Sequence, residues 1–421
     1  MADISALTAA LADRYRIGMH TTEQLNAAPA DRARQKLPAT LLILLATGLF
    51  TITAVAQMPR TRPPNTYHPA ARPTAPPVAT ELHPDGTITF RLRAPDATHV
   101  DVIVDGLERT SMAKGADGVW SVLVGPVEPE LHRYSFSVDG VSIADPTNVP
   151  ATVGTPLGES YIEVPGSPAR FDESQDVPHG VLQLRDYMSS AMKLRRHLVV
   201  WVPPGYDGQP ARRFPVLYLK HGSGGTEADW SSVGRAGVIL ENLLAKRDAV
   251  PMIIVMPNGN PAQVAGSSPD GIEEIGQELI TDIIPLIEHN YRVIADRDHR
   301  AIAGLSMGAG QSFITGLKHP ALFAYVGAFS SGAVGDAGFR LRTAVPGFLD
   351  STAAVSKRLR LLFLSCGEQD PRYPGHLDLV DTLAAHQIRH EWFSTPGRHE
   401  FKVWRHSLAA MLPRLFRAPH G

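Results

Sequence analysis

The chain has a single cysteine, Cys366, among its 421 residues, so an intrachain disulfide framework and cysteine-based zinc sites are excluded. Neither charge sign is in excess, because 40 Lys and Arg stand against 42 Asp and Glu. No basic patch with interleaved aromatic residues occurs either, so we expect no nucleic-acid partner. The sequence also lacks H-E-x-x-H and similar ligand spacings, and we expect no catalytic metal and no cofactor. Cys366 ends the apolar run LLFLSC, which predicts a buried small side chain.

Long hydrophobic runs are equally scarce, and the main one is the 17-residue run at residues 39–55. Arg32, Arg34 and Lys36 precede it and Ala54-Val55-Ala56 ends it, so residues 1–56 are predicted to be a secretory signal cleaved after Ala56. The protein is then secreted or periplasmic. About 35 residues before the apolar run are long for a signal, so a start at a later methionine or a retained membrane anchor stays open. Oligomeric state has no signature in the sequence.

The length predicts two folded units with appendages. Residues 57–79 contain seven prolines and almost no large apolar residue, which predicts a stiff linker. Residues 80–165 alternate short strand-like runs with four Asp-Gly turns, a pattern typical of a β-sandwich. Trp120 in this part could stack on a sugar ring, but Val119 and Val122 beside it favour a core position.

Residues 166–421 change to alternating strands and helices, which predicts the α/β class with a mostly parallel sheet covered on both faces. The clearest helix is predicted at residues 272–290, with a bend at Pro285. Ligand sites in such sheets lie at the carboxyl ends of the strands. Strands are predicted at residues 197–202, 216–219, 252–256, 301–303, 325–329, 361–365 and 391–393.

The stretch HRAIAGLSMGAGQSF places G-x-S-x-G between one of these strands and a helical pattern. This context predicts a nucleophile elbow, in which Ser306 stands on a strained turn flanked by small residues. The backbone N–H of Met307, at the start of the helix, is then a predicted oxyanion donor. G-x-S-x-G alone is also common in glycine-rich turns, so its weight depends on the partners found elsewhere.

Those partners follow in the order that this arrangement requires, serine, acid and histidine. Asp370 comes just after the strand predicted at residues 361–365, and His399 follows the last strand. Each could by itself be an ordinary turn residue. Together with Ser306 they predict a catalytic triad in which His399 is the base and Asp370 orients it. Glu368 is the rival acid.

The second oxyanion donor is expected after an earlier strand, where PVLYLK runs into His221-Gly222-Ser223-Gly224-Gly225. An HGxGG run allows close backbone approach, so the N–H of Gly222 or Ser223 is the predicted partner of Met307. The alternative is a merely flexible turn. A phosphate-binding loop is excluded because the G-K-[ST] ending is absent.

These segments resemble the esterase D/feruloyl esterase group of α/β-hydrolases, the carbohydrate esterase family 1 type, which includes enterochelin esterases and antigen 85 mycolyltransferases. The matching segments are PVLYLKHGSGGTEADW, MIIVMPNGN, HRAIAGLSMGAGQSF, FLSCGEQD and GRHEFKVWRHSL. The segment HRYSFSVDGVSIADPTN is similar to the Ig-like E-set sandwich that precedes the catalytic domain in some members. The resemblance implies an α/β-hydrolase fold over residues 166–421 and an Ig-like domain over residues 80–165. It also implies that Trp230 and Asn258 border the acyl site, although Trp230 could equally be packing. Ala309 and Arg398 replace glycines usual in the family.

We therefore predict a secreted serine carboxylic-ester hydrolase that forms an acyl-enzyme without a cofactor. The resemblance points to feruloyl or acetyl esters of plant polysaccharide as substrates. Three alternatives stay open: a siderophore esterase, an acyltransferase to a sugar acceptor, and a non-catalytic carbohydrate-binding protein. A membrane partner is expected only if the amino-terminal segment is retained.

Overall fold

The computed structural model describes residues 78–148, 159–336, 338–350 and 359–417. The apolar run at residues 39–55 and all of the predicted linker before residue 78 lie outside the described residues, so the signal, anchor and linker stay predictions. In the described ranges, no helix is long and apolar enough to cross a membrane.

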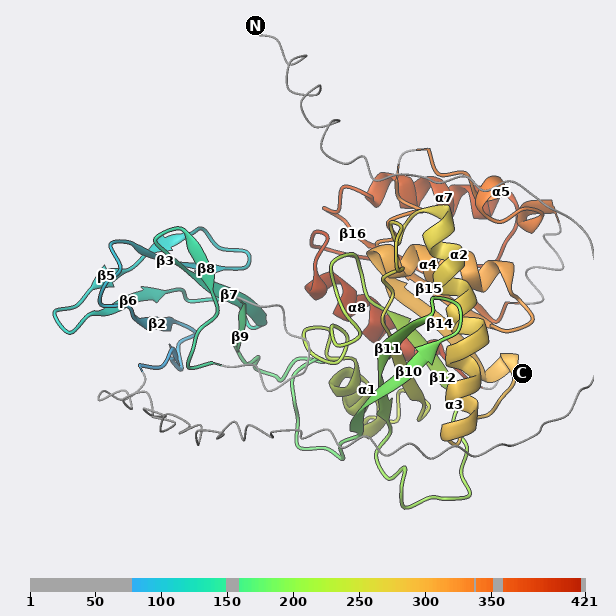
Figure 1. The fold of residues 1–421 in the computed structure, drawn as a ribbon, viewed down its shortest axis with the longest axis horizontal. Helices are drawn as coiled ribbons and strands as arrows, with labels where there is room; N and C mark the ends of the chain where they lie inside the picture. Colours follow the sequence, from blue (N-terminus) through green and yellow to red (C-terminus); the bar gives the residue numbers. More distant parts are fainter. Residues whose placement is uncertain (1–77, 149–158, 337, 351–358, 418–421) are drawn as a thin grey trace, which may run out of the picture. The chain divides into compact units, whose positions relative to one another are not determined.

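The first described part of the chain forms two antiparallel sheets (Figure 1). One sheet has the strand order β1-β2-β6-β5, and the other has the order β4-β3-β7-β8 with β9 also pairing with β7. The strands are β1 (Glu81–Leu82), β2 (Ile88–Arg93), β3 (Val100–Val104), β4 (Thr110–Ser111), β5 (Ala113–Lys114), β6 (Val119–Val124), β7 (Leu131–Val138), β8 (Val141–Ile143) and β9 (Ser160–Glu163).

Both sheets contribute to one apolar core, in which Phe90 of β2 packs against Tyr134 and Phe136 of β7. Trp120 is buried in this core and its indole N–H donates to the carbonyl of Ala94, which confirms the core interpretation. The glycines of all four predicted Asp-Gly turns have positive φ, between 77° and 89°, the region that glycine enters without strain. The sequence therefore located these turns. The Ig-like assignment and the exact domain limits stay predictions.

The second part is built on an eight-stranded sheet with the order β10-β11-β13-β12-β14-β15-β16-β17. The first two pairings, β10 with β11 and β11 with β13, are antiparallel, and all the others are parallel. The strands are β10 (Val181–Ser189), β11 (Leu194–Val202), β12 (Val216–Lys220), β13 (Ile253–Pro257), β14 (Arg300–Leu305), β15 (Tyr325–Phe329), β16 (Leu361–Gly367) and β17 (Glu391–Thr395).

Helices cover both faces of this sheet, which is why its central strands are continuous apolar runs. Along β12, Val216 and Tyr218 enter one core while Leu217 and Leu219 enter the other. The core with Val216 also holds residues of α2 (Pro269–Glu278), α3 (Ile284–Asn290), α4 (Ser306–Lys318) and α7 (Tyr373–Ala385), and the opposite core holds residues of α1 (Ala236–Ala245) and α8 (Phe401–Met411). Short helices are η2 (Arg297–His299), α5 (Leu341–Ala344), η3 (Phe348–Asp350) and η4 (Leu412–Arg414).

Two local features differ from the predictions. The predicted helix at residues 272–290 is interrupted by a π-helical turn, η1 (Leu279–Ile283), directly before Pro285. Proline lacks an N–H and crowds the preceding turn, and a wider turn relieves that conflict.

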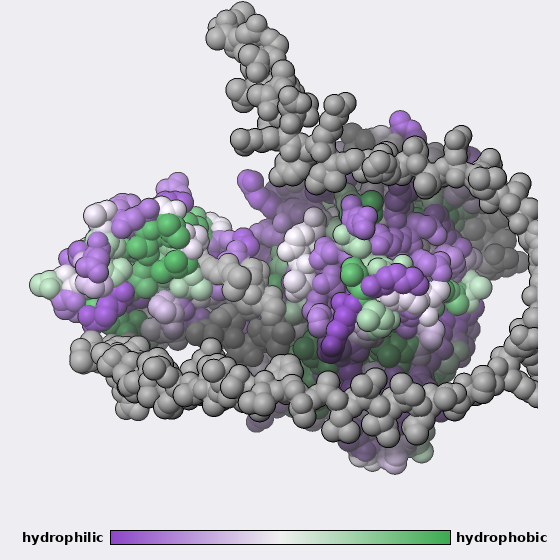
Figure 2. All heavy atoms as spheres, in the orientation of Figure 1, coloured by the Kyte–Doolittle hydropathy of each residue, from purple (hydrophilic) through white to green (hydrophobic). Residues whose placement is uncertain are grey.

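The strand β10 was not predicted at all. It is an edge strand, and half of the exposed large hydrophobic side chains of the described residues lie on it or at the start of β11. On the face shown in Figure 2, most described residues are hydrophilic, and hydrophobic residues gather in separate groups, one of them on the amino-terminal sheets.

Candidate active site

Ser306 lies at the junction between β14 and α4 and has φ of 50°, a left-handed conformation that is unusual for a serine. Its neighbours must be small. A Cβ at Gly304 would lie 2.6 Å from the backbone of Gly308, and a Cβ at Gly308 would lie 2.3 Å from the carbonyl oxygen of His221. The G-x-S-x-G spacing is therefore a steric requirement of this strand-to-helix turn.

Three side chains from separate strand ends form a hydrogen-bonded chain. Nε2 of His399 lies 2.8 Å from Oγ of Ser306, and Nδ1 of His399 lies 2.7 Å from Oδ2 of Asp370. Because a carboxylate only accepts, Nδ1 carries the proton, and Nε2 is left free to accept the hydroxyl proton of Ser306. The residues follow β14, β16 and β17, whose carboxyl ends meet at one edge of the sheet.

Asp370 is 3% exposed, and its Oδ1 accepts a hydrogen bond of 3.0 Å from the backbone N–H of Arg372. Burial by itself would raise the pKa of Asp370, but the hydrogen bonds from His399 and Arg372 hold the pKa below its ordinary value. The rival acid, Glu368, is exposed, and its carboxylate accepts from the hydroxyl of Ser394 at 3.4 Å. Of the two acids that the sequence offered, the structure brings Asp370 to His399.

The loop after β12 lies beside the serine, since a Cβ at Gly222 would be 3.3 Å from Cβ of Ser306. Gly222 is buried and Ser223 is exposed. Met307 is in the first turn of α4, where backbone N–H groups have no partner inside the helix. The two predicted sources of oxyanion donors therefore flank Ser306, and their roles stay predictions.

His221 holds this loop against a second one. Its Nδ1 donates to the carbonyl of Gly222 over 2.7 Å, and its Nε2 accepts from the N–H of Gly259 over 2.7 Å. Burial lowers the pKa of His221, which favours the neutral ring that this pair of contacts requires. His221 thus sets the separation of the Gly222 loop from the Asn258 loop.

The two side chains proposed to border the acyl group have different surroundings. Asn258 is half-buried, and its amide donates to Glu227 Oε2 over 2.9 Å, next to the glycine held by His221. Trp230 is 1% exposed and donates its indole N–H to the carbonyl of Lys220. Its ring packs edge-on against Phe329 and Phe401. These contacts favour the packing role of Trp230 over contact with a substrate.

His376 has a supporting position that the sequence did not reveal. It is fully buried in α7, where its Nε2 accepts from the N–H of Ser331 and its Nδ1 donates to the carbonyl of Arg372, both over 2.9 Å. Gly332, next to Ser331, donates its N–H to the carbonyl of Ser306. His376 thus links the loop behind Ser306 to the loop of Asp370. It is one of 17 histidines in the chain, and nothing in the local sequence distinguishes it.

Lys220 is the last residue of β12 and stands directly before the loop that contains Gly222. The side chain is fully buried, and its Nζ has no hydrogen-bond partner among the described residues. Burial lowers the pKa of Lys220 from 10.5 to about 7. A buried, unpaired amine lowers the stability of the fold.

We expect Lys220→Met to raise the free energy of unfolding at pH 7 by on the order of 4 kcal/mol, since each unit of pKa shift corresponds to about 1.4 kcal/mol. The folded pKa lies below the unfolded one, so between pH 7 and 10 the unfolded wild type binds a proton that the folded state has released. Wild-type stability therefore rises with pH through this window, and the advantage of the variant shrinks.

The measurement is chemical unfolding of both proteins at pH 7, 8 and 9. Lys246→Met makes the same chemical change at an exposed position after α1 and serves as the matched control, with no pH-dependent gain expected. A gain for Lys220→Met that stays constant with pH would refute the buried neutral amine.

The fold is that of an α/β-hydrolase. Its marks are the strand order, the serine on a strained turn after β14, and the acid and histidine after two later strands. Residues 189–358 match the family model described as putative esterase. The matched range contains the HGxGG loop and Ser306 and ends before Asp370 and His399. In the described ranges no three His, Cys, Asp or Glu side chains are grouped as metal ligands.

Several known proteins are similar to this chain, and the share of the chain that each one matches differs. An endo-1,4-beta-xylanase/feruloyl esterase of Xylanibacter ruminicola is 31% identical over 347 residues, which are 80% of this chain and 46% of that protein. The chain thus spans less than half of this relative. A solved ferulic acid esterase is 25% identical, with a TM-score of 0.50 over 56% of this chain and 96% of its own. The enterobactin esterase of Shigella flexneri is 18% identical and shares the fold, with a TM-score of 0.55 over 78% of this chain and 92% of its own.

Proposed function

We propose that the protein is a serine carboxylic-ester hydrolase in which Ser306, His399 and Asp370 form the catalytic triad. The observation that carries this proposal is the hydrogen-bonded chain from Asp370 through His399 to the hydroxyl of Ser306, on a turn with φ of 50°. Such a chain activates a weak nucleophile by giving its proton a nearby acceptor.

In the proposed reaction, Oγ of Ser306 attacks the ester carbonyl carbon while Nε2 of His399 takes the hydroxyl proton. The carbonyl oxygen becomes an oxyanion, and the N–H groups of Met307 and of Gly222 or Ser223 stabilise it. The carbon–oxygen bond of the ester then breaks, and His399 gives the proton to the departing alcohol. Water repeats these steps on the acyl-enzyme and releases the acid. Asp370 keeps the histidine in the required tautomer and stabilises its charged form.

For the substrate, we propose feruloyl or acetyl esters of plant polysaccharide. The supporting observation is the 31% identity to a protein named as both a xylanase and a feruloyl esterase.

The charges near the site agree with a neutral substrate. Lys220 is buried, and Arg372 is paired with Asp336 at 2.9 Å, which leaves Arg398 exposed on the histidine loop. A ferric siderophore is large and anionic, and it is better served by a cluster of free cations.

The experiment that tests this proposal compares kcat/KM on methyl ferulate, acetylated xylan and a catecholate trilactone. We expect the highest value on one of the first two substrates. A preference for the trilactone by more than tenfold would replace the polysaccharide ester with a siderophore ester. Product analysis with an added sugar acceptor separates hydrolysis from acyl transfer, and failure to turn over p-nitrophenyl acetate would favour a non-catalytic binding protein.

A further inference from the structure

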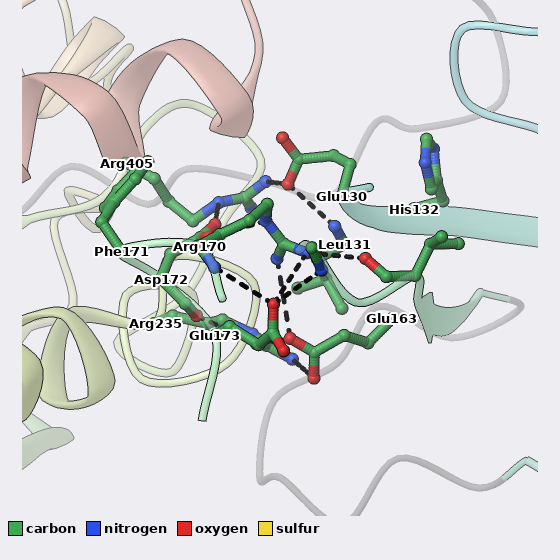
Figure 3. A network of polar contacts seen from close by, with 12 residues as sticks. Glu130, Leu131, His132, Glu163, Arg170, Phe171, Asp172, Glu173, Arg235 and Arg405 are labelled. Atoms are coloured by element: carbon green, nitrogen blue, oxygen red, sulfur yellow. Dashed lines mark hydrogen bonds and ion pairs between the residues drawn. The ribbon is translucent and has the colours of Figure 1, made fainter. Parts of the chain in front are cut away.

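Arg405 of α8 is a buried arginine in a polar network that the proposed reaction does not use (Figure 3). It is 1% exposed, and its guanidinium has three partners. Nη1 donates to the carbonyl of Val233 over 2.8 Å, Nε lies 2.7 Å from Oδ2 of Asp172, and Nη2 donates to Oε1 of Glu130. Burying an arginine is costly unless its charge is paired and its N–H groups are satisfied. Here two carboxylates pair the charge and both terminal nitrogens donate hydrogen bonds, whereas Nε is in ion-pair contact with Asp172 without making a hydrogen bond.

Glu130 comes from the first part of the chain, directly before β7. It is 8% exposed, and its Oε1 also accepts from the N–H of Leu131 over 2.8 Å. The carbonyl of Glu130 accepts from the N–H of Val164, just after β9. Backbone hydrogen bonds within the amino-terminal sheets thus fix the carboxylate that meets Arg405.

The segment between the two parts is held by the same network. Arg170 lies 3.0 Å from Oδ1 of Asp172 and donates to the carbonyl of Val164 over 2.7 Å. Arg235, at the start of α1, is paired with Glu163 at the end of β9. Asp172 is therefore shared between Arg170 and Arg405, so the connecting segment cannot move without breaking contacts to α8.

The helix that carries Arg405 begins at Phe401, two residues after His399. Its N-cap residue, Glu400, makes no side-chain capping hydrogen bond, so its first turn lacks one usual restraint. The ring of Trp404 packs edge-on against the ring of His399, with centroids 4.9 Å apart. Trp404 and Arg405 are adjacent in sequence. A shift of the helix at Arg405 would therefore move the side chain that supports His399.

We propose that Arg405 is a positioning residue for His399, and that Glu130 of the amino-terminal sheets completes its pairing. The amino-terminal sheets then contribute to turnover, although their residues do not touch the reacting atoms. This inference rests on the proposed role of His399 as the base. A displacement of about 1 Å at a catalytic group can cost up to about a hundredfold in rate.

The experiment uses the full chain and the variant Glu130→Gln, which removes the charge but keeps a hydrogen-bond acceptor. We expect kcat on p-nitrophenyl acetate to fall about tenfold with KM within twofold of wild type. The rate at which a fluorophosphonate labels Ser306 should fall by a similar factor, because labelling also depends on His399. All assays are run well below the melting temperature of each variant.

The matched control is Glu128→Gln. Glu128 is paired with Lys402 at 3.3 Å, so it joins the same two parts at the same helix, but the pair is exposed. We expect less than a twofold change in kcat or in labelling rate for this variant. Exposed pairs of this kind contribute little to stability or to position.

Arg405→Lys provides a second variant in case Glu130→Gln folds poorly. It keeps the charge but cannot reach three partners, so we expect a fall in kcat and labelling rate of at least the same size. If the folded variants melt earlier but keep the wild-type kcat and labelling rate, the network is only structural and the inference is wrong. If wild type itself is not labelled at Ser306, the proposed function fails instead.

Discussion

Replacing Ser306 by alanine is expected to lower kcat for ester hydrolysis by on the order of 10⁵ to 10⁶, because members of a catalytic triad act as a unit. The variant lacks the oxygen that His399 contacts at 2.8 Å and therefore cannot form the acyl-enzyme. Alanine is close to serine in size and meets the same backbone strain at φ of 50°, so the fold should persist. Initial rates on p-nitrophenyl acetate, with circular dichroism and melting curves on the same samples, measure both effects.

The control for this prediction is Ser223→Ala in the loop after β12. The proposed oxyanion donor there is a backbone N–H, and the substitution retains it, so we expect kcat within about threefold of wild type. Fluorophosphonate labelling followed by peptide mapping identifies the nucleophile directly. A label on a serine other than Ser306 would contradict the assignment, whatever the kinetics of the alanine variant.

Much of the large sheet could be predicted because its central strands are buried on both faces. Such strands read as short apolar runs, and this pattern located the six strands β11 to β16. The seventh located strand, β17, is a partly buried edge strand that was predicted at residues 391–393. The missed strand, β10, is one of the two edge strands and has the sequence VLQLRDYMS. Its polar residues break any apolar run, and its strand conformation depends on nine pairings with β11, which local sequence does not encode. The π-helical turn before Pro285 was missed for a similar reason, since a proline signals a disturbance but not its form.

In the candidate site, too, some residues could be predicted from the sequence and others could not. Ser306, Asp370 and His399 could be proposed because each follows a recognisable strand end in a fixed order. Asp370 and Glu368 are only two positions apart, so the sequence does not show which of the two side chains points toward His399. The structure shows that the carboxylate of Asp370 contacts His399. The burial of Lys220 and the contacts of His376 and Arg405 had no local signal. Each depends on partners that are distant in sequence.

The second large effect is expected at the acid. Asp370→Asn should lower kcat by on the order of 10⁴ with little loss of stability. A carboxylate accepts the Nδ1 proton of His399, whereas the amide of asparagine can donate to Nδ1 and so favours the proton on Nε2. Nε2 then cannot accept the proton of Ser306. The measurement is kcat at pH 7 for variant and wild type, on samples with matched melting curves.

The comparison variant is Glu368→Gln, which makes the same chemical change two residues away on an exposed side chain. We expect it to change kcat by less than threefold, because its carboxylate faces Ser394 and not His399. Comparing the two variants separates a general effect of losing a negative charge near the site from a specific effect on the tautomer of His399. If Glu368→Gln lost activity and Asp370→Asn kept it, the acid would be Glu368 and the contact between Asp370 and His399 would be only structural.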